Sequence, residues 1–125
     1  MTVSNASVKQ CVDFSSEMMT PTLVLTCDGA YAMSLATTMR SIVDSNRSAW
    51  PLDFYLLISE FPKEVQEKLE RSLPAQSALI HWLPVDVTQF QDFGVVAAGS
   101  YVSRMAYARL LISQVLPDTI TRVLY

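Results

Sequence analysis

The stretch from residue 22 to residue 43, TLVLTCDGAYAMSLATTMRSIV, decides how the rest of the chain is interpreted. Its first six residues are apolar and rich in β-branched side chains, which predicts a short strand buried on both faces. Asp28 and Gly29 then interrupt the apolar run with residues typical of a turn. From Tyr31 onward, apolar residues recur with the spacing of one helical face. These residues are Ala32, Leu35, Ala36, Met39, Ile42 and Val43.

A strand, a tight turn and a helix form the first half of a βαβ unit. In open parallel sheets, ligands bind just beyond the carboxyl ends of the strands. Asp28 and Tyr31 lie at that end of the first expected strand. A carboxylate and an aromatic ring can therefore face one pocket.

Three further strands are expected along the chain. Residues 52–58, LDFYLLI, are nearly all apolar, which favours a central position in the sheet. Residues 78–83, ALIHWL, form the next expected strand, and residues 121–125, TRVLY, begin the last one. Together with the helices between them, these strands predict an α/β, Rossmann-like fold with a mostly parallel sheet.

Two helices connect these later strands. For the first, we expect Ser59 to act as the N-cap, Pro62 to lie in the first turn, and Val65 and Leu69 to be buried. The second is expected over residues 103–116, and Pro117 ends it. Its apolar contacts are expected from Ala106, Leu110 and residues 112–115.

The length of 125 residues indicates one domain, which we place at residues 21–125. The first 20 residues are polar and weakly patterned, so we expect a flexible leader. The sequence stops within an apolar strand, which suggests a domain truncated before its end.

Composition argues against several classes of protein. The net charge of −3 gives no reason to expect a nucleic-acid partner. No apolar run approaches the roughly 20 residues that a membrane span needs, and no signal peptide is recognisable. The two cysteines, Cys11 and Cys27, favour a reducing compartment. We therefore expect a cytoplasmic location, or a peripheral position at a membrane surface.

The turn at Asp28 is the first candidate site. With one glycine it matches neither the dinucleotide fingerprint nor the P-loop, so it cannot wrap a diphosphate in backbone N–H groups. It can instead hold a base and a ribose, with Asp28 accepting hydrogen bonds and Tyr31 stacking on the base. The alternative, equally supported by the residues, is that Asp28 caps the helix and Tyr31 only packs.

Arg109 is the second candidate, because a guanidinium on an otherwise apolar helix must find a carboxylate, a phosphate or water. The alternative is a buried structural ion pair. Ser103 lies near the start of the same helix and can either cap it or contact a ligand. His81 is the only histidine and is expected to be exposed or at the core edge. No hydrolytic triad or zinc motif is present, so no catalytic or metal-binding residue is assigned.

Four segments together resemble the N-terminal half of glycosyltransferase family 8, whose members are retaining nucleotide-sugar transferases. These segments are LVLTCDGAYAMSLATTMRSIV, LDFYLLIS, IHWLPVDVTQF and SYVSRMAYARLLISQVLPDTITRVLY. The resemblance implies the N-terminal half of a GT-A fold and a UDP-sugar donor. It also implies a glycan or lipid-linked sugar as acceptor, and Mn²⁺ or Mg²⁺ as the cofactor of the full-length family.

The resemblance also implies roles for individual residues. Asp28 and Tyr31 match the positions that contact uracil, and Thr26 matches a strand-end position whose backbone touches the base. Arg109 matches an arginine near the diphosphate and the donor sugar, and Ser103 is grouped with it. The family's Asp-x-Asp metal motif would follow Tyr125 and is absent. We therefore expect that this chain alone binds no cation and transfers no sugar.

A second interpretation is a non-catalytic α/β interaction module. In that case the sheet edge at Tyr125 would pair with another chain, including a second copy, by strand addition or swapping. A Rossmann-type methyltransferase or dehydrogenase is a third interpretation, which the single turn glycine disfavours.

Overall fold

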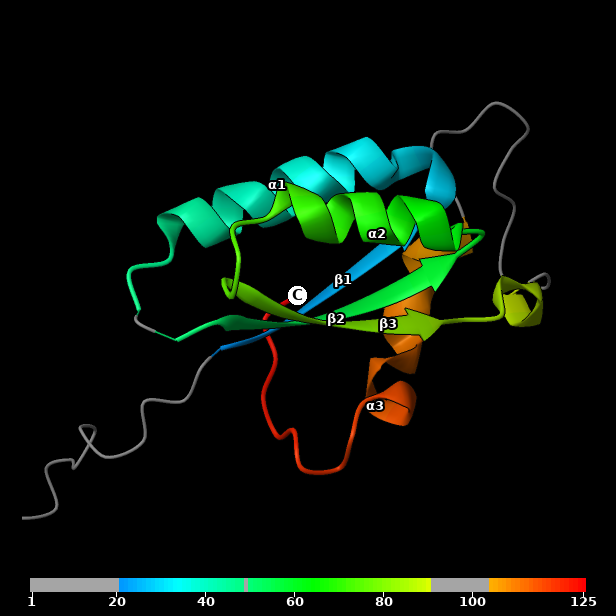
Figure 1. The fold of residues 1–125 in the computed structure, drawn as a ribbon. Coiled ribbons are helices and arrows are strands. Elements are labelled where there is room, and N and C mark those ends of the chain that lie inside the picture. Colours follow the sequence, from blue (N-terminus) through cyan, green and yellow to red (C-terminus); the bar gives the residue numbers. More distant parts are fainter. Residues whose placement is uncertain (1–20, 49, 91–103) are drawn as a thin grey trace, which may run out of the picture.

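The computed structural model describes residues 21–48, 50–90 and 104–125 (Figure 1). Three parallel strands form one sheet in the order β1-β2-β3. The strands are β1 (Thr22–Asp28), β2 (Leu52–Ser59) and β3 (Ala78–Pro84). The helical elements, with η marking a 3₁₀ helix, are η2 (Gly29–Tyr31), α1 (Ala32–Ser45), α2 (Lys63–Ser72), η3 (Val87–Phe90), η4 (Arg104–Leu111) and α3 (Ile112–Val115). The predicted α/β fold with a parallel sheet is confirmed.

Strand β2 lies in the middle of the sheet, as its apolar sequence predicts. Its alternate side chains enter two separate cores, one on each face. Phe54 and Leu56 are fully buried on the face covered by α1 and α2, whereas Leu57 is fully buried on the face covered by η4. Figure 1 shows these helical layers on opposite sides of the sheet.

Helix α1 buries the face that the sequence predicts. Leu35 and Met39 are buried, and the other predicted apolar positions pack partly against the same core. On α2, Leu69 is buried and Val65 is half-buried. The predicted cap at Ser59 is wrong, because β2 continues through Ser59 and α2 begins only at Lys63, where Pro62 occupies the N-cap position without a side-chain bond.

On the other face, the expected single helix over residues 103–116 is divided. Its described part is the 3₁₀ helix η4 followed by the short helix α3. A 3₁₀ helix has three residues per turn, so residues three apart lie in one line. Met105, Ala108 and Leu111 are accordingly buried. The predicted contacts from Ala106 and Leu110 are wrong, since both side chains are exposed.

The expected fourth strand is reduced to one parallel bridge between Leu124 and Leu23. The Val24 N–H donates to the Leu124 carbonyl and the Leu124 N–H donates to the Thr22 carbonyl, each at 2.8 Å. The C-terminal segment therefore lies along the outer edge of β1 (Figure 1). The opposite edge of the described sheet is β3.

Candidate functional site

The turn after β1 is built around the Asp28 carboxylate. Asp28 keeps an extended backbone, with φ −96° and ψ 167°, and its Oδ1 accepts a hydrogen bond from the Ala30 N–H at 3.0 Å. This is the capping arrangement that the sequence left open. Capping occupies only one oxygen, because Oδ2 makes no hydrogen bond to any residue that the structure describes. A carboxylate with one uncommitted oxygen can still accept a hydrogen bond from a ligand.

Gly29 is required at its position because there is no room for a side chain. A Cβ atom at this position would lie 2.1 Å from the carbonyl oxygen of Glu60. Glu60 follows directly after β2 and has a positive φ of 49°. The ends of β1 and β2 therefore approach each other backbone to backbone, and this contact sets where the Asp28 turn lies.

Thr26 and Asp28 lie on one face of the sheet, since side chains alternate along a strand and Val24 belongs to the core beneath η4. The Thr26 Oγ1 lies 3.1 Å from the Tyr125 hydroxyl, within hydrogen-bonding distance. Tyr31 ends η2 and is 45% exposed. The structure thus brings Thr26, Asp28 and Tyr31 to the same end of β1, where the Asp28 carboxylate offers an acceptor and the Tyr31 side chain is partly exposed.

Cys27, between these residues, faces the opposite core and is buried. Burial, and then the nearby Asp28 charge, raise the pKa of its thiol from 9.0 to about 11. The thiol donates a weak hydrogen bond to the Asp28 carbonyl at 3.0 Å. A protonated, buried thiol is a poor nucleophile, so Cys27 serves packing.

Arg109 lies exposed on η4 and makes no hydrogen bond or ion pair with the residues that the structure describes. The alternative of a buried structural ion pair is therefore wrong. Its guanidinium is exposed to an anion from solvent, and no hydrogen bond or ion pair within the described residues joins it to the Asp28 turn. Ser103 lies outside the described residues.

His81 is partly exposed, as predicted, and has partners that the sequence analysis missed. Its Nε2 lies 2.7 Å from Asp53 Oδ1, and its ring stacks on Tyr55 with centroids 4.2 Å apart. The parallel register places Tyr55 beside His81, so only strand pairing could have revealed this group. Burial, and then the Asp53 charge, raise the pKa of Tyr55.

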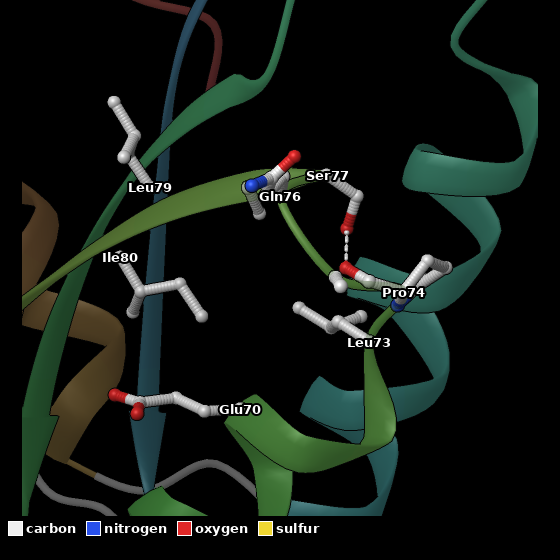
Figure 2. A pocket seen from close by; sticks show the side chains of 9 residues that line it. Glu70, Leu73, Pro74, Gln76, Ser77, Leu79 and Ile80 are labelled. Atoms are coloured by element: carbon white, nitrogen blue, oxygen red, sulfur yellow. Dashed lines mark hydrogen bonds between the residues drawn. The ribbon is translucent and has the colours of Figure 1, made fainter.

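A hollow of about 290 Å³ lies at the opposite end of the sheet (Figure 2). It is formed where the loop after α2 enters β3, so it is distant from the carboxyl ends of the strands. Among the described residues, no three His, Cys, Asp or Glu side chains gather to hold a metal ion. None of the described helices is long and apolar enough to cross a membrane.

Comparison with known proteins gives a consistent answer. The family model for glycosyl transferase family 8 matches residues 22–125. Glycosyltransferase GlyF from Streptococcus pneumoniae serotype 4 is 29% identical over 107 residues, which cover 86% of this chain and 25% of that protein. The chain therefore spans about a quarter of this curated relative.

Two solved structures share the fold. One is an active-site mutant of LgtC, and the other is the galactosyltransferase LgtC in complex with donor and acceptor sugar analogs. Each has a TM-score of 0.67 and 21% sequence identity, and the match covers 78% of this chain and 34% of that one. The predicted GT-A-type fold is confirmed by this likeness.

Proposed function

We propose a function from one premise: this chain belongs to glycosyl transferase family 8. It forms the nucleotide-binding portion of a transferase that moves a hexose from a UDP-sugar to a glycan or lipid-linked sugar, with retention of anomeric configuration. The complete reaction is proposed for a whole protein, since the chain spans about a quarter of its curated relative. The observation that carries the proposal is the Asp28 carboxylate at the end of β1, with Oδ2 uncommitted among the described residues.

Uracil offers an N–H donor on its edge and a flat ring. Asp28 Oδ2 accepts from that N–H while Oδ1 continues to cap η2, so binding does not disrupt the turn. Tyr31 stacks on the ring, and the end of β1 at Thr26 supports the base from its backbone. This arrangement recognises the base, so the diphosphate has to be bound by other groups.

Arg109 is the residue we assign to the diphosphate and donor sugar, together with Ser103. The assignment of Arg109 is supported by its exposed guanidinium, which has no ion pair among the described residues and can bind a phosphate oxygen. The family's Mn²⁺ or Mg²⁺ does not fit the described residues, because no set of three ligands gathers there. No step of the proposal therefore passes through a metal ion.

The test is a titration of the isotopically labelled chain with UDP, monitored through the amide signals in NMR spectra. A parallel titration with ADP, which carries a different base, is the comparison. We expect UDP to shift the signals of Thr26, Asp28 and Tyr31 more than ADP does. Asp28→Asn should weaken UDP binding about tenfold or more, because a hydrogen bond to a charged group is lost. Asp118→Asn, on an exposed carboxylate in the loop after α3, is the matched control. Equal affinities for UDP in the two variants would refute the assignment.

The interaction-module alternative rests on another observation. Leu124 and Tyr125 are 63% and 57% exposed beside the edge of β1. If that edge pairs two copies, sedimentation of the chain should show a dimer that Leu124→Lys dissociates. A monomer at every concentration tested would remove this second candidate.

A further inference from the structure

The outer edge of β3 carries main-chain groups that have no partner among the described residues. The Leu52 N–H donates to the Ser77 carbonyl, and the Val85 N–H donates to the Ile58 carbonyl. In a parallel pair, the main-chain groups of every second residue bond to the neighbouring strand. The N–H and C=O groups of the odd-numbered residues of β3 therefore point toward β2. The N–H and C=O groups of Ala78, Ile80 and Trp82 therefore point away from the described sheet. Pro84 has no N–H and ends this edge.

Beside this edge lies the hollow of about 290 Å³ between the end of α2 and the start of β3. Figure 2 shows Leu73, Ile80 and Glu70 around it. Its volume is at the lower limit of small-molecule pockets, about 300–1,000 Å³, which suits a single inserted side chain. Strand edge and hollow adjoin through Ile80, which contributes its outward backbone to one and its side chain to the other.

Of the described residues that line the hollow, Glu70 alone has an ionisable side chain. The Trp82 indole N–H donates to its Oε1 at 2.6 Å, which holds the carboxylate against β3. Its Oε2 makes no hydrogen bond to a described residue. Glu67, one helical turn earlier on α2, is also exposed. Helix α2 as a whole carries three glutamates and three cations, but the charge that its side chains place at the hollow itself is the negative charge of Glu70.

We propose that the β3 edge binds an extended, basic peptide segment of another protein. The peptide main chain adds as a further strand and bonds to Ala78, Ile80 and Trp82. An arginine or lysine side chain of the peptide enters the hollow and pairs with Glu70. An edge strand with open donors and acceptors is the usual template for such strand addition.

Charge argues against a second copy of this chain as the occupant. Antiparallel pairing of two copies would be centred on Ile80, because Ala78 and Trp82 lie symmetrically on either side of it. Glu70 lies beside Ile80, so two Glu70 carboxylates would then approach the same axis. Like charges in close apposition oppose association, whereas a basic segment is attracted.

The probe is a short, fluorescently labelled peptide of alternating valine and lysine, titrated with the full 125-residue chain and followed by anisotropy. Two control peptides replace lysine with glutamate, or carry N-methyl groups on alternate amides. We expect binding of the lysine peptide, and a loss of about tenfold or more on N-methylation, because the added hydrogen bonds cannot form. The glutamate peptide should bind more weakly than the lysine peptide.

Variants of the chain test the hollow. Glu70→Gln should weaken binding of the lysine peptide about two- to fivefold, as expected for the loss of a surface ion pair. Glu64→Gln, in the first turn of α2 and outside the hollow, should leave its affinity unchanged. The peptide should shift the amide signals of Ala78, Ile80 and Trp82, and leave those of the Asp28 turn in place. Failure here would therefore be distinct from failure of the UDP titration.

Three results would overturn the proposal. The first is absence of binding by the lysine peptide, and the second is equal binding of the N-methylated peptide. The third is a dimer of the chain that Ile80→Pro dissociates, which would assign the edge to a second copy. The N-methylated peptide tests strand addition on the unaltered protein, so the outcome does not depend on whether Ile80→Pro folds.

Discussion

Replacing Gly29 with alanine would place a methyl carbon 2.1 Å from the Glu60 carbonyl oxygen. The two backbones would have to separate by about 0.9 Å to reach the 3.0 Å that real contacts require. Neither side can yield easily, because Gly29 begins η2 at the end of β1 and Glu60 is fixed at the end of β2. Overpacking typically costs about 1–3 kcal/mol, and a clash with backbone lies at the upper end. We expect Gly29→Ala to lose about 3 kcal/mol of stability, or roughly 10 °C in Tm.

Urea unfolding followed by circular dichroism measures this loss. Ala30→Ser, at the exposed neighbouring position, is the matched control and should remain within about 0.5 kcal/mol of the parent. Because the same contact positions Asp28, UDP binding should weaken in Gly29→Ala at a temperature where the variant is still folded. A Gly29→Ala stability within about 0.5 kcal/mol of the parent, with unchanged urea dependence, would refute the reasoning.

Three further predictions concern single side chains. Asp28→Ala should lose about 1 kcal/mol of stability in urea, whereas Asp28→Asn should lose less, because an amide oxygen still accepts from the Ala30 N–H. The raised pKa of Cys27 means that the folded thiol stays protonated while the unfolded thiol ionises, so unfolding free energy should fall as pH rises from about 9 to about 11. The decline should be smaller in Cys27→Ala, and identical pH profiles would contradict this. His81→Ala should lower the free energy of unfolding by about 1–2 kcal/mol. His81→Phe should lower it less, because phenylalanine keeps the stacking on Tyr55 and loses only the bond to Asp53. Equal losses in the two variants would exclude a role for stacking.

Much of the fold follows from short-range patterns. The apolar run at residues 22–27 and the helical spacing from Ala32 to Val43 predict β1 and the buried face of α1. The nearly continuous apolar run in β2 predicts its central place, because a strand covered on both faces cannot alternate polar and apolar residues. Each of these signals is contained within one element.

The errors arise where an element depends on its neighbours. An α-helix is expected over residues 103–116, but its described part begins as a 3₁₀ helix over Arg104–Leu111, and the tighter turn moves the buried line to Met105, Ala108 and Leu111. Serine is a favoured helix N-cap residue, yet pairing with β1 extends β2 through Ser59. The bond between Asp53 and His81 joins residues on separate strands and leaves no local pattern.

For the candidate site, the sequence by itself determined the chemical groups: an acid, a glycine and a phenol directly after a buried strand. Only the tertiary structure decided that Gly29 faces the Glu60 carbonyl, that Asp28 keeps one oxygen uncommitted among the described residues, and that the β3 edge points outward. The reason is physical: periodicity and turn chemistry act between residues a few positions apart. Close backbone approaches and strand edges are set by register between segments that are distant in the chain.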